Sequence, residues 1–571
     1  MTRQVVTRAL RSVPRATILS RTGPQSSFPR TPSFRNRAPP SSLTNYTSFT
    51  RNLSLSARRL KEEKEKKDDD DDDVEERKWS TPLAKQLAEA ISATGPVPLA
   101  SFMRMCLTGD IGGYYTGAIE KSDEQNRDQF GAAGDFVTSP EISQVFGELC
   151  GLWYVTEWMA QGRPSKGVEL IEIGPGRGTL MDDMLRTIQN FPEMAKAIDA
   201  VYMVEASPQL RTTQKNLLCG EDAVMIESSS KAGYHSTCKY GNIPVVWTES
   251  IKSIPHDPEK TPFIMAHEFF DALPIHAFQL VEVPSIPPSS TPEDSPVSAI
   301  TTSGPKQPKS PPGTTGPTLE WRELLVSPTP PGSTHSSLRT PPSHNPHLTP
   351  PPDFQLTLSP SPTRHSLHLP ELSPRYRALK SSSSSRLPEG TPKGAGAIIE
   401  ISPDTYLVST SIATLIGGSS RHPKPSPRGA ALILDYGPGD GSVPVNSLRG
   451  IRKHNLVSPF AEPGLTDLSA DVDFEAIAEA TTNASEGVEV HGPVEQGWLL
   501  QGLGGEQRVE MLAKSLKEKG AEKETEDLKK AWKRLVDRGP NGMGRVYKAL
   551  AIVPENEGRR RPVGFGGDVV M

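Results

Sequence analysis

A glycine-rich loop carries the first chemical signal in this sequence. Residues 172–178 read Glu-Ile-Gly-Pro-Gly-Arg-Gly and overlap the end of a mostly aliphatic run at 168–173. Glycines at Gly174, Gly176 and Gly178 would let the backbone turn tightly and let a ligand approach the amide groups without a Cβ in the way. The spacing differs from the G-x-G-x-x-G of dinucleotide sites, and Glu172 would repel a pyrophosphate but attract a sulfonium cofactor that carries an ammonium group. The alternative is a tight turn without a ligand.

A second acid follows the next predicted strand. Glu205 comes directly after residues 201–204, where a carboxylate could hydrogen-bond both hydroxyls of a ribose. An exposed glutamate at a strand end is the alternative interpretation. Together with the glycine loop, Glu205 favours a nucleoside cofactor.

Two further carboxylates follow an apolar run at 263–266. Glu268 and Asp271 lie in the segment His-Glu-Phe-Phe-Asp-Ala-Leu-Pro at 267–274. At the carboxyl edge of a sheet, such a pair could orient a guanidinium, which stays charged and offers five donors in a rigid fork. The spacing alone leaves an equal alternative, in which Asp271 caps a turn and Glu268 is solvated.

Two other segments hold candidate substrate or structural residues. In residues 134–143, Ser139-Pro140-Glu141 is typical of a helix start with Ser139 as the N-cap, which leaves Asp135 and Phe136 without a structural explanation. Asp435 follows the continuous apolar run 430–434 and is the next candidate acid.

These residues must be positioned by an α/β fold. Strand-like apolar runs alternate with helical segments, and such alternation predicts a parallel sheet with helices on both faces. The predicted strands are 168–173, 201–204, 244–247, 263–266, 319–326, 397–401, 430–434 and 546–553, with helices at 180–188 and from Ser207 and Ser402 onward.

The first 60 residues have a composition of their own. They contain eleven arginines, no lysine and no acid, and they are rich in Ser, Thr and Pro, which is typical of a mitochondrial transit peptide. A basic arm that binds nucleic acid is the alternative. Cleavage after Arg59 would lower the net charge from −5 to about −16, because the eleven arginines leave. A chain that acidic is not expected to bind DNA or RNA.

Composition also predicts which segments lie outside the core. The charge run 61–78 reads as a solvated linker, and the segments 284–316 and 327–391 are mostly Pro, Ser and Thr, so we expect both to be disordered insertions. No run of 18 or more apolar residues occurs, so no membrane span is expected. The four cysteines form no C-x-x-C pair, which argues against a disulfide framework or a zinc site.

Taken together, these segments resemble the MidA-like family, a branch of class I methyltransferases that includes mitochondrial complex I assembly factors acting as protein arginine methyltransferases. The matching segments run in the family's order from about residue 80 onward. They are GYY (113–115), GDFVTSPEISQVFGEL (134–149), EIGPGRGTLMDDMLR (172–186), VEASPQLRTTQ (204–214), HEFFDALP (267–274), WRELLV (321–326), IEISP (399–403), ILDYG (433–437), LRGIRKH (448–454), PGLTDLSADVDF (463–474) and MGRVYKALA (543–551). The family usually has Asn where this chain has His267.

The resemblance implies a class I, Rossmann-like methyltransferase sheet with a helical N-terminal extension and an inserted substrate-covering region. It implies S-adenosyl-L-methionine as cofactor, bound by Glu172, the 174–178 loop and Glu205. It also implies methylation, of the symmetric type, of an arginine in the complex I subunit related to the 49 kDa protein, in the mitochondrial matrix. The expected layout is 1–60 transit peptide, 61–78 linker, 79–150 helical extension, 151–283 cofactor-binding core, 284–316 insertion, 317–326 core strand, 327–391 insertion, 392–555 remaining core and substrate region, and 556–571 tail.

The reaction expected is in-line transfer of the sulfonium methyl to a guanidinium nitrogen, with Glu268 and Asp271 as the catalytic carboxylates and no metal required. Two alternatives use the same fold. One is a non-catalytic assembly chaperone that binds the immature subunit, and the other, disfavoured by the glycine spacing, is an oxidoreductase.

Overall fold

The computed structural model describes residues 77–116, 138–227, 233–284, 318–334, 351–380 and 393–566. The predicted leader 1–60, nearly all of the linker 61–78, the candidate residues Asp135 and Phe136, and all of the first insertion except Pro284 lie outside these ranges. Within them, no helix is long and apolar enough to cross a membrane.

The larger sheet of the described structure has nine strands and a parallel centre. Five neighbouring strands run parallel, and antiparallel strands extend the sheet at both edges, so the predicted parallel sheet is the middle of a mixed one. In spatial order the strands are β16 (Val488–Glu495), β17 (Tyr547–Pro554), β12 (Ala430–Tyr436), β7 (Thr261–His267), β2 (Val168–Ile173), β3 (Ile198–Val204), β6 (Pro244–Thr248), β5 (Tyr234–Thr237) and β4 (Ile226–Glu227).

Helices cover both faces of this sheet, which confirms the predicted α/β class. On β2, Val168 and Leu170 pack into one buried cluster and Ile171 and Ile173 into another, as expected when successive side chains point to opposite faces. The first cluster includes side chains of α5 (Gln144–Ala160), α6 (Thr179–Ile188) and α8 (Pro208–Cys219), and the second those of α11 (Pro403–Gly417) and α12 (Phe474–Ala484).

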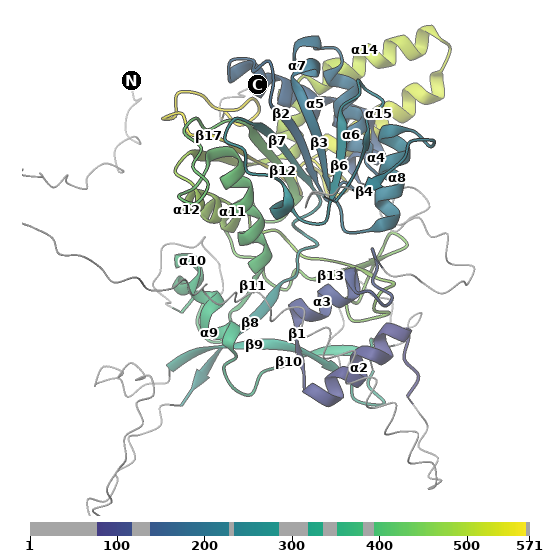
Figure 1. The fold of residues 1–571 in the computed structure, drawn as a ribbon. Helices are drawn as coiled ribbons and strands as arrows, with labels where there is room; N and C mark the ends of the chain where they lie inside the picture. The colour runs from purple at the N-terminus through teal and green to yellow at the C-terminus, as the bar shows by residue number, and fades with distance from the viewer. Residues whose placement is uncertain are drawn as a thin grey trace, which may run out of the picture. The chain divides into compact units, whose positions relative to one another are not determined.

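A second, antiparallel sheet is built from segments far apart in the sequence. Its strands are β1 (Val97–Pro98), β9 (Thr318–Pro328), β8 (His276–Val283), β11 (Ile398–Ile401) and β10 (Phe354–Leu358). The helices α2 (Pro82–Thr94) and α3 (Leu99–Thr108) pack on it. In Figure 1, α3 and β8 lie below the larger sheet.

The strand predicted at 317–326 is present as β9, but it belongs to this second sheet and not to the larger one. The central strands of the larger sheet are buried on both faces, whereas β9 buries Trp321, Glu323 and Val326 and leaves most of its other side chains half-buried. Antiparallel sheets tolerate such partly exposed strands, and β9 places Val326 in a cluster with α2 and α3 and Trp321 in another with α10 (Pro374–Ala378).

The prediction that all of 327–391 is a disordered insertion was wrong. Residues 351–380 form β10, α9 (Arg364–His368), a 3₁₀ turn at Leu369–Glu371 and α10 (Pro374–Ala378). A few anchoring residues hold this Pro- and Ser-rich segment: Phe354 and Tyr376 are fully buried, and Arg375 pairs with Asp473 at 3.0 Å. Residues 335–350 and 381–392 lie outside the described structure.

The remaining described elements surround these two sheets. A small sheet is formed by β14 (Asn455–Val457), β13 (Arg449–Arg452) and β15 (Asp467–Ser469). The other helices are α4 (Ser139–Ile142), α7 (Pro192–Ala197), a 3₁₀ turn at Ile251–Ser253, α13 (Gln496–Gly502), α14 (Gly505–Glu518) and α15 (Glu522–Val536).

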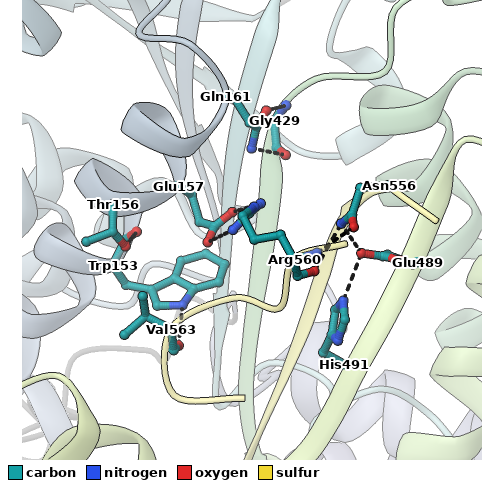
Figure 2. A network of polar contacts seen from close by, with 10 residues as sticks. All are labelled: Trp153, Thr156, Glu157, Gln161, Gly429, Glu489, His491, Asn556, Arg560 and Val563. Atoms are coloured by element: carbon teal, nitrogen blue, oxygen red, sulfur yellow. Dashed lines mark hydrogen bonds and ion pairs between the residues drawn. The ribbon is translucent and has the colours of Figure 1, made fainter. Parts of the chain in front are cut away.

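The segment after β17 is held against α5 by a polar network, shown in Figure 2. Arg560 donates to both carboxylate oxygens of Glu157, at 2.8 and 2.7 Å, and Glu157 is almost fully buried. The indole Nε1 of Trp153 donates to the Val563 carbonyl at 3.1 Å. Residues of the predicted tail up to 566 are therefore part of the folded unit.

Candidate active site

A cavity of about 730 Å³ lies at the carboxyl ends of β2, β3 and β7. The chain passes from β2 outward to β3 and β6 and then crosses to β7 on the other side of β2, so the cavity lies at the point where the strand order reverses. The opposite wall comes from α3, Tyr115, β13 and β15. Six of the predicted site residues line the cavity: Glu172, Gly174, Gly176, Glu205, Glu268 and Asp271.

The glycine loop has the backbone conformation that requires glycine. Gly174, Gly176 and Gly178 have φ of 67°, 52° and 86°, in the left-handed region that residues with a Cβ avoid. A Cβ at Gly174 would lie 2.8 Å from the Phe269 ring. Gly178 is the N-cap of α6 and is not among the cavity-lining residues; a Cβ there would lie 3.2 Å from Gln214 Cγ. Gly174 and Gly176 therefore border the cavity, whereas Gly178 allows helix packing.

Glu205 and the loop are tied together by a residue that the sequence analysis missed. The Gln214 amide nitrogen donates to the Gly176 carbonyl at 2.7 Å and to Glu205 Oε2 at 3.2 Å, while its oxygen accepts from Trp247 Nε1 at 2.9 Å. The other Glu205 oxygen accepts the Ser207 N–H at 2.8 Å. Gln214 is fully buried between Leu210 and Leu218 on the inner face of α8. Leu210, Gln214 and Leu218 follow one another at intervals of four residues, so they share one face of the helix. A polar residue at an otherwise apolar position of that face is the sequence signal that could have identified Gln214.

Glu172 is a buried acid at the glycine-loop end of the cavity. It is 2% exposed, and among the described residues its Oε2 has no hydrogen-bond partner. Burial raises the pKa of Glu172 to about 8 and that of Glu205 to about 7. A cationic ligand that supplies donors would favour the ionised form of these carboxyls.

The turn after β7 is held by Asp435. One of its carboxylate oxygens accepts the N–H groups of Phe269, Phe270 and Asp271 at 3.0–3.3 Å, and the other accepts the N–H of Tyr436. Asp435 is fully buried and is not among the residues that line the cavity. It therefore has a structural role, which fixes the backbone that carries Glu268 and Asp271.

Glu268 is held in a strained conformation beside the cavity. Its φ is 48°, which is uncommon for a residue with a Cβ, and its N–H donates to the Leu434 carbonyl at 2.9 Å. The side chain is 11% exposed, so Glu268 is not the solvated residue of the alternative interpretation. Burial and the neighbouring Asp271 raise the pKa of Glu268 to about 8, although a hydrogen bond from Tyr547 opposes the shift.

Asp271 lies beside Glu268 and is also buried. Its Oδ2 accepts a hydrogen bond from the Tyr436 hydroxyl, and burial raises its pKa, although this hydrogen bond and the nearby Arg449 guanidinium oppose the shift. A turn at 271–272 follows Asp271, as the turn-capping interpretation also predicts. Nearby, Tyr115 donates to Asp467 Oδ1 at 2.9 Å. This end of the cavity thus combines carboxyl groups with the hydroxyls of Tyr115, Tyr436 and Tyr547, all of which line it.

His267 carries no charge here. Burial lowers its pKa to about 3, its ring packs edge-on against Phe146, and its Nε2 lies 3.4 Å from Glu268 Oε1. A neutral imidazole at this distance packs against the carboxyl without compensating a negative charge.

The helix predicted to start at Ser139 begins there with a different cap. Thr138, not Ser139, is the N-cap of α4, and Ser143 caps the following helix α5. Thr138, Pro140 and Glu141 line the cavity, and Thr179 donates to Glu141 Oε1 at 2.7 Å.

Comparison with known proteins agrees with this geometry. Residues 149–494 match the family described as "Putative S-adenosyl-L-methionine-dependent methyltransferase". The chain is 30% identical over 474 residues to the Drosophila melanogaster protein named "Protein arginine methyltransferase NDUFAF7 homolog, mitochondrial", with 83% of this chain and 85% of that protein covered. The human NDUFAF7 is 28% identical over 478 residues, with 83% and 84% covered.

A solved structure shares the fold. A protein from Burkholderia thailandensis, crystallised with S-adenosyl-homocysteine, superposes with a TM-score of 0.54 at 19% identity, and the match covers 86% of this chain and 93% of that one. The chain therefore belongs to the S-adenosyl-L-methionine-dependent methyltransferase family that includes the mitochondrial protein arginine methyltransferase NDUFAF7.

Proposed function

We propose that this protein methylates an arginine of the complex I subunit related to the 49 kDa protein, in the mitochondrial matrix, and that this reaction supports complex I assembly. One observation carries the enzymatic part of the proposal. A single cavity brings the glycine loop and Glu205 together with Glu268 and Asp271, so a methyl donor and a guanidinium can meet in it.

The residues at one end of the cavity fit the cofactor. A volume of about 730 Å³ is within the range of small-molecule sites. Gly174 and Gly176 keep the loop backbone free of side chains, and the Glu172 oxygen that lacks a partner among the described residues can accept from a ligand donor. We assign Glu172, Gly174, Gly176 and Glu205 to cofactor binding. When bound, S-adenosyl-L-methionine supplies an electrophilic methyl group on a sulfonium centre.

The carboxyl groups at the other end suit a guanidinium. An arginine side chain stays charged at neutral pH, so its nitrogen has little free electron density for attack. The ionised carboxylate of Glu268 can accept a hydrogen bond from that nitrogen and draw the positive charge away from it. With the cofactor bound, methyl transfer would form the new N–C bond and break the S–C bond, and Glu268 would accept the guanidinium proton that is released.

Asp271 and the tyrosines would orient the nucleophile. Asp271 is fixed by Tyr436, and its Oδ1 has no hydrogen-bond partner among the described residues. That oxygen can accept from a second guanidinium nitrogen, because the planar fork presents parallel N–H groups. The resulting alignment supplies the proximity that an in-line displacement needs.

The compartment is inferred from the relatives and from the composition of the first 60 residues, and the 49 kDa-type substrate from the resemblance to the MidA-like family. NDUFAF7 proteins are named as mitochondrial protein arginine methyltransferases, and the first 60 residues have the composition of a transit peptide. We extend to this chain the expectations of a matrix location, the 49 kDa-type partner and a symmetric dimethylated product.

The experiment is mass spectrometry of that subunit, isolated from cells that carry the wild-type protein, no protein, or the Glu268→Gln variant. Methylarginine present only with the wild type supports the proposal. Normal assembly with Glu268→Gln and an unmethylated subunit would instead support a chaperone.

A further inference from the structure

Three potential metal ligands converge outside the cavity. His276 is the first residue of β8, Glu323 lies in β9 and His365 lies in α9. One ligand atom of each residue lies within 4.8 Å of the other two. His276 Nδ1 lies 2.7 Å from Glu323 Oε1, and His365 Nδ1 lies 3.3 Å from the same oxygen. None of the three lines the cofactor cavity.

Glu323 is the most deeply buried member of this cluster. The Glu323 side chain is 1% exposed, and among the described residues its ion-pair contacts are only with the two histidines. An ionised carboxylate in a buried place is costly unless a positive charge compensates it.

The ligand types select the class of cation. Two imidazoles and one carboxylate suit zinc, whereas calcium and magnesium prefer oxygen ligands alone. Zinc binds imidazole nitrogen and carboxylate oxygen at about 2.0–2.2 Å, so neighbouring ligand atoms of a tetrahedral site lie roughly 3.3 Å apart. The His365–Glu323 distance already matches this value, and the His276–Glu323 hydrogen bond would open by about 0.6 Å to admit the ion.

We propose that His276, Glu323 and His365 bind one Zn²⁺ ion, which fastens the 351–380 segment to the second sheet. A helix of five residues such as α9 has little stability of its own, so it needs anchors. The fourth ligand position is open to water or to the Thr363 hydroxyl, which donates a hydrogen bond to Glu323. The sequence analysis predicted no zinc site, because it examined cysteine spacing, whereas these ligands are far apart in the sequence and include no cysteine.

The test is metal binding by the full chain without an affinity tag, after treatment with a chelator. Zn²⁺ is titrated by calorimetry, and Co²⁺, which reports tetrahedral coordination by its visible absorption, is titrated in parallel. The variants are His365→Ala and Glu323→Gln, and the matched control is His368→Ala, which removes an exposed histidine from the same helix.

The wild type and the control should each bind one equivalent of metal, with a rise in melting temperature of roughly 3 °C or more at saturating Zn²⁺. Both variants should lose at least about 100-fold in affinity, since each removes a direct ligand. His365 is partly exposed, so its variant should fold even if Glu323→Gln does not. A wild type that binds no stoichiometric metal, or a His365→Ala variant that binds it equally well, would overturn the proposal.

Discussion

Replacing Glu268 by glutamine separates its chemical role from its structural one. Glutamine has nearly the same shape, and at pH 7 about nine-tenths of a carboxyl with a pKa of about 8 is already protonated and neutral. The variant should therefore fold and bind the cofactor with little change. It cannot accept the guanidinium proton, so its single-turnover rate should fall roughly 100-fold or more, which corresponds to about 2.7 kcal/mol of transition-state stabilisation.

The pH dependence gives a second readout. The active form of Glu268 is ionised and its pKa is raised, so the wild-type rate should increase about tenfold per pH unit below pH 8 and level off above it. The Gln variant should lose this dependence. In Tyr547→Phe the rise of the rate with pH should move to higher pH, because the hydrogen bond from Tyr547 lowers the pKa of Glu268 in the wild type.

The assay is single-turnover methylation at saturating cofactor, since the raised pKa values of Glu172 and Glu205 would otherwise add their own pH effects to binding. The matched control is Glu249→Gln, which changes a glutamate that lines the same cavity but is largely exposed. A Glu268→Gln enzyme whose single-turnover rate is normal and still rises with pH as in the wild type would refute the assignment of Glu268 as proton acceptor.

Five other changes have defined expected outcomes. Gly176→Val should abolish cofactor binding by calorimetry, because a branched residue is strained at φ 52° and would enter the cavity; undiminished affinity would mean that the loop is only a turn. Glu205→Ala should weaken the same binding by roughly 1–3 kcal/mol, the scale of charge-assisted hydrogen bonds, and unchanged binding would remove Glu205 from the site. Arg560→Ala should lower the free energy of unfolding by roughly 2–3 kcal/mol in urea titrations, because it leaves the buried Glu157 carboxylate without its partner; no change would show that the pair is solvent-screened. Deleting 286–316 should leave the melting temperature nearly unchanged, whereas deleting 351–380 should lower it, since the second segment buries Phe354 and Tyr376; equal effects would contradict the distinction.

The sequence was sufficient to predict the central sheet because its strands are short, mostly apolar runs. Residues 168–173, 263–266 and 430–434 are buried on both faces in the structure, and such runs are readable without tertiary information. The partner strands of residues 319–326 could not be predicted from the apolar pattern. This segment, β9, pairs with β8, β10 and β1, which lie in distant parts of the sequence, so its own residues do not indicate which sheet it joins.

The same limit applies to the site. Strand ends correctly predicted that the loop at 174–178, Glu205 and the 267–274 segment lie at one edge of the sheet, because parallel strands end at the same edge. The residues that hold these groups in place were missed, because their hydrogen bonds form only in the folded chain. Gln214 donates to Glu205 and accepts from Trp247, and Tyr436 donates to Asp271, which is 165 positions away in the sequence. Composition also misled at 351–380, where a few buried side chains among many Pro and Ser residues are enough to order the segment.

The most direct test of the central claim is a reconstituted reaction with purified components. The mature chain, S-adenosyl-L-methionine with an isotope-labelled methyl group and the recombinant 49 kDa-type subunit are combined, and peptides of the subunit are sequenced by mass spectrometry. We predict labelled methyl groups on an arginine with the wild type and none with Glu268→Gln. A wild-type protein that binds the cofactor yet leaves every arginine of a folded subunit unlabelled would contradict the account.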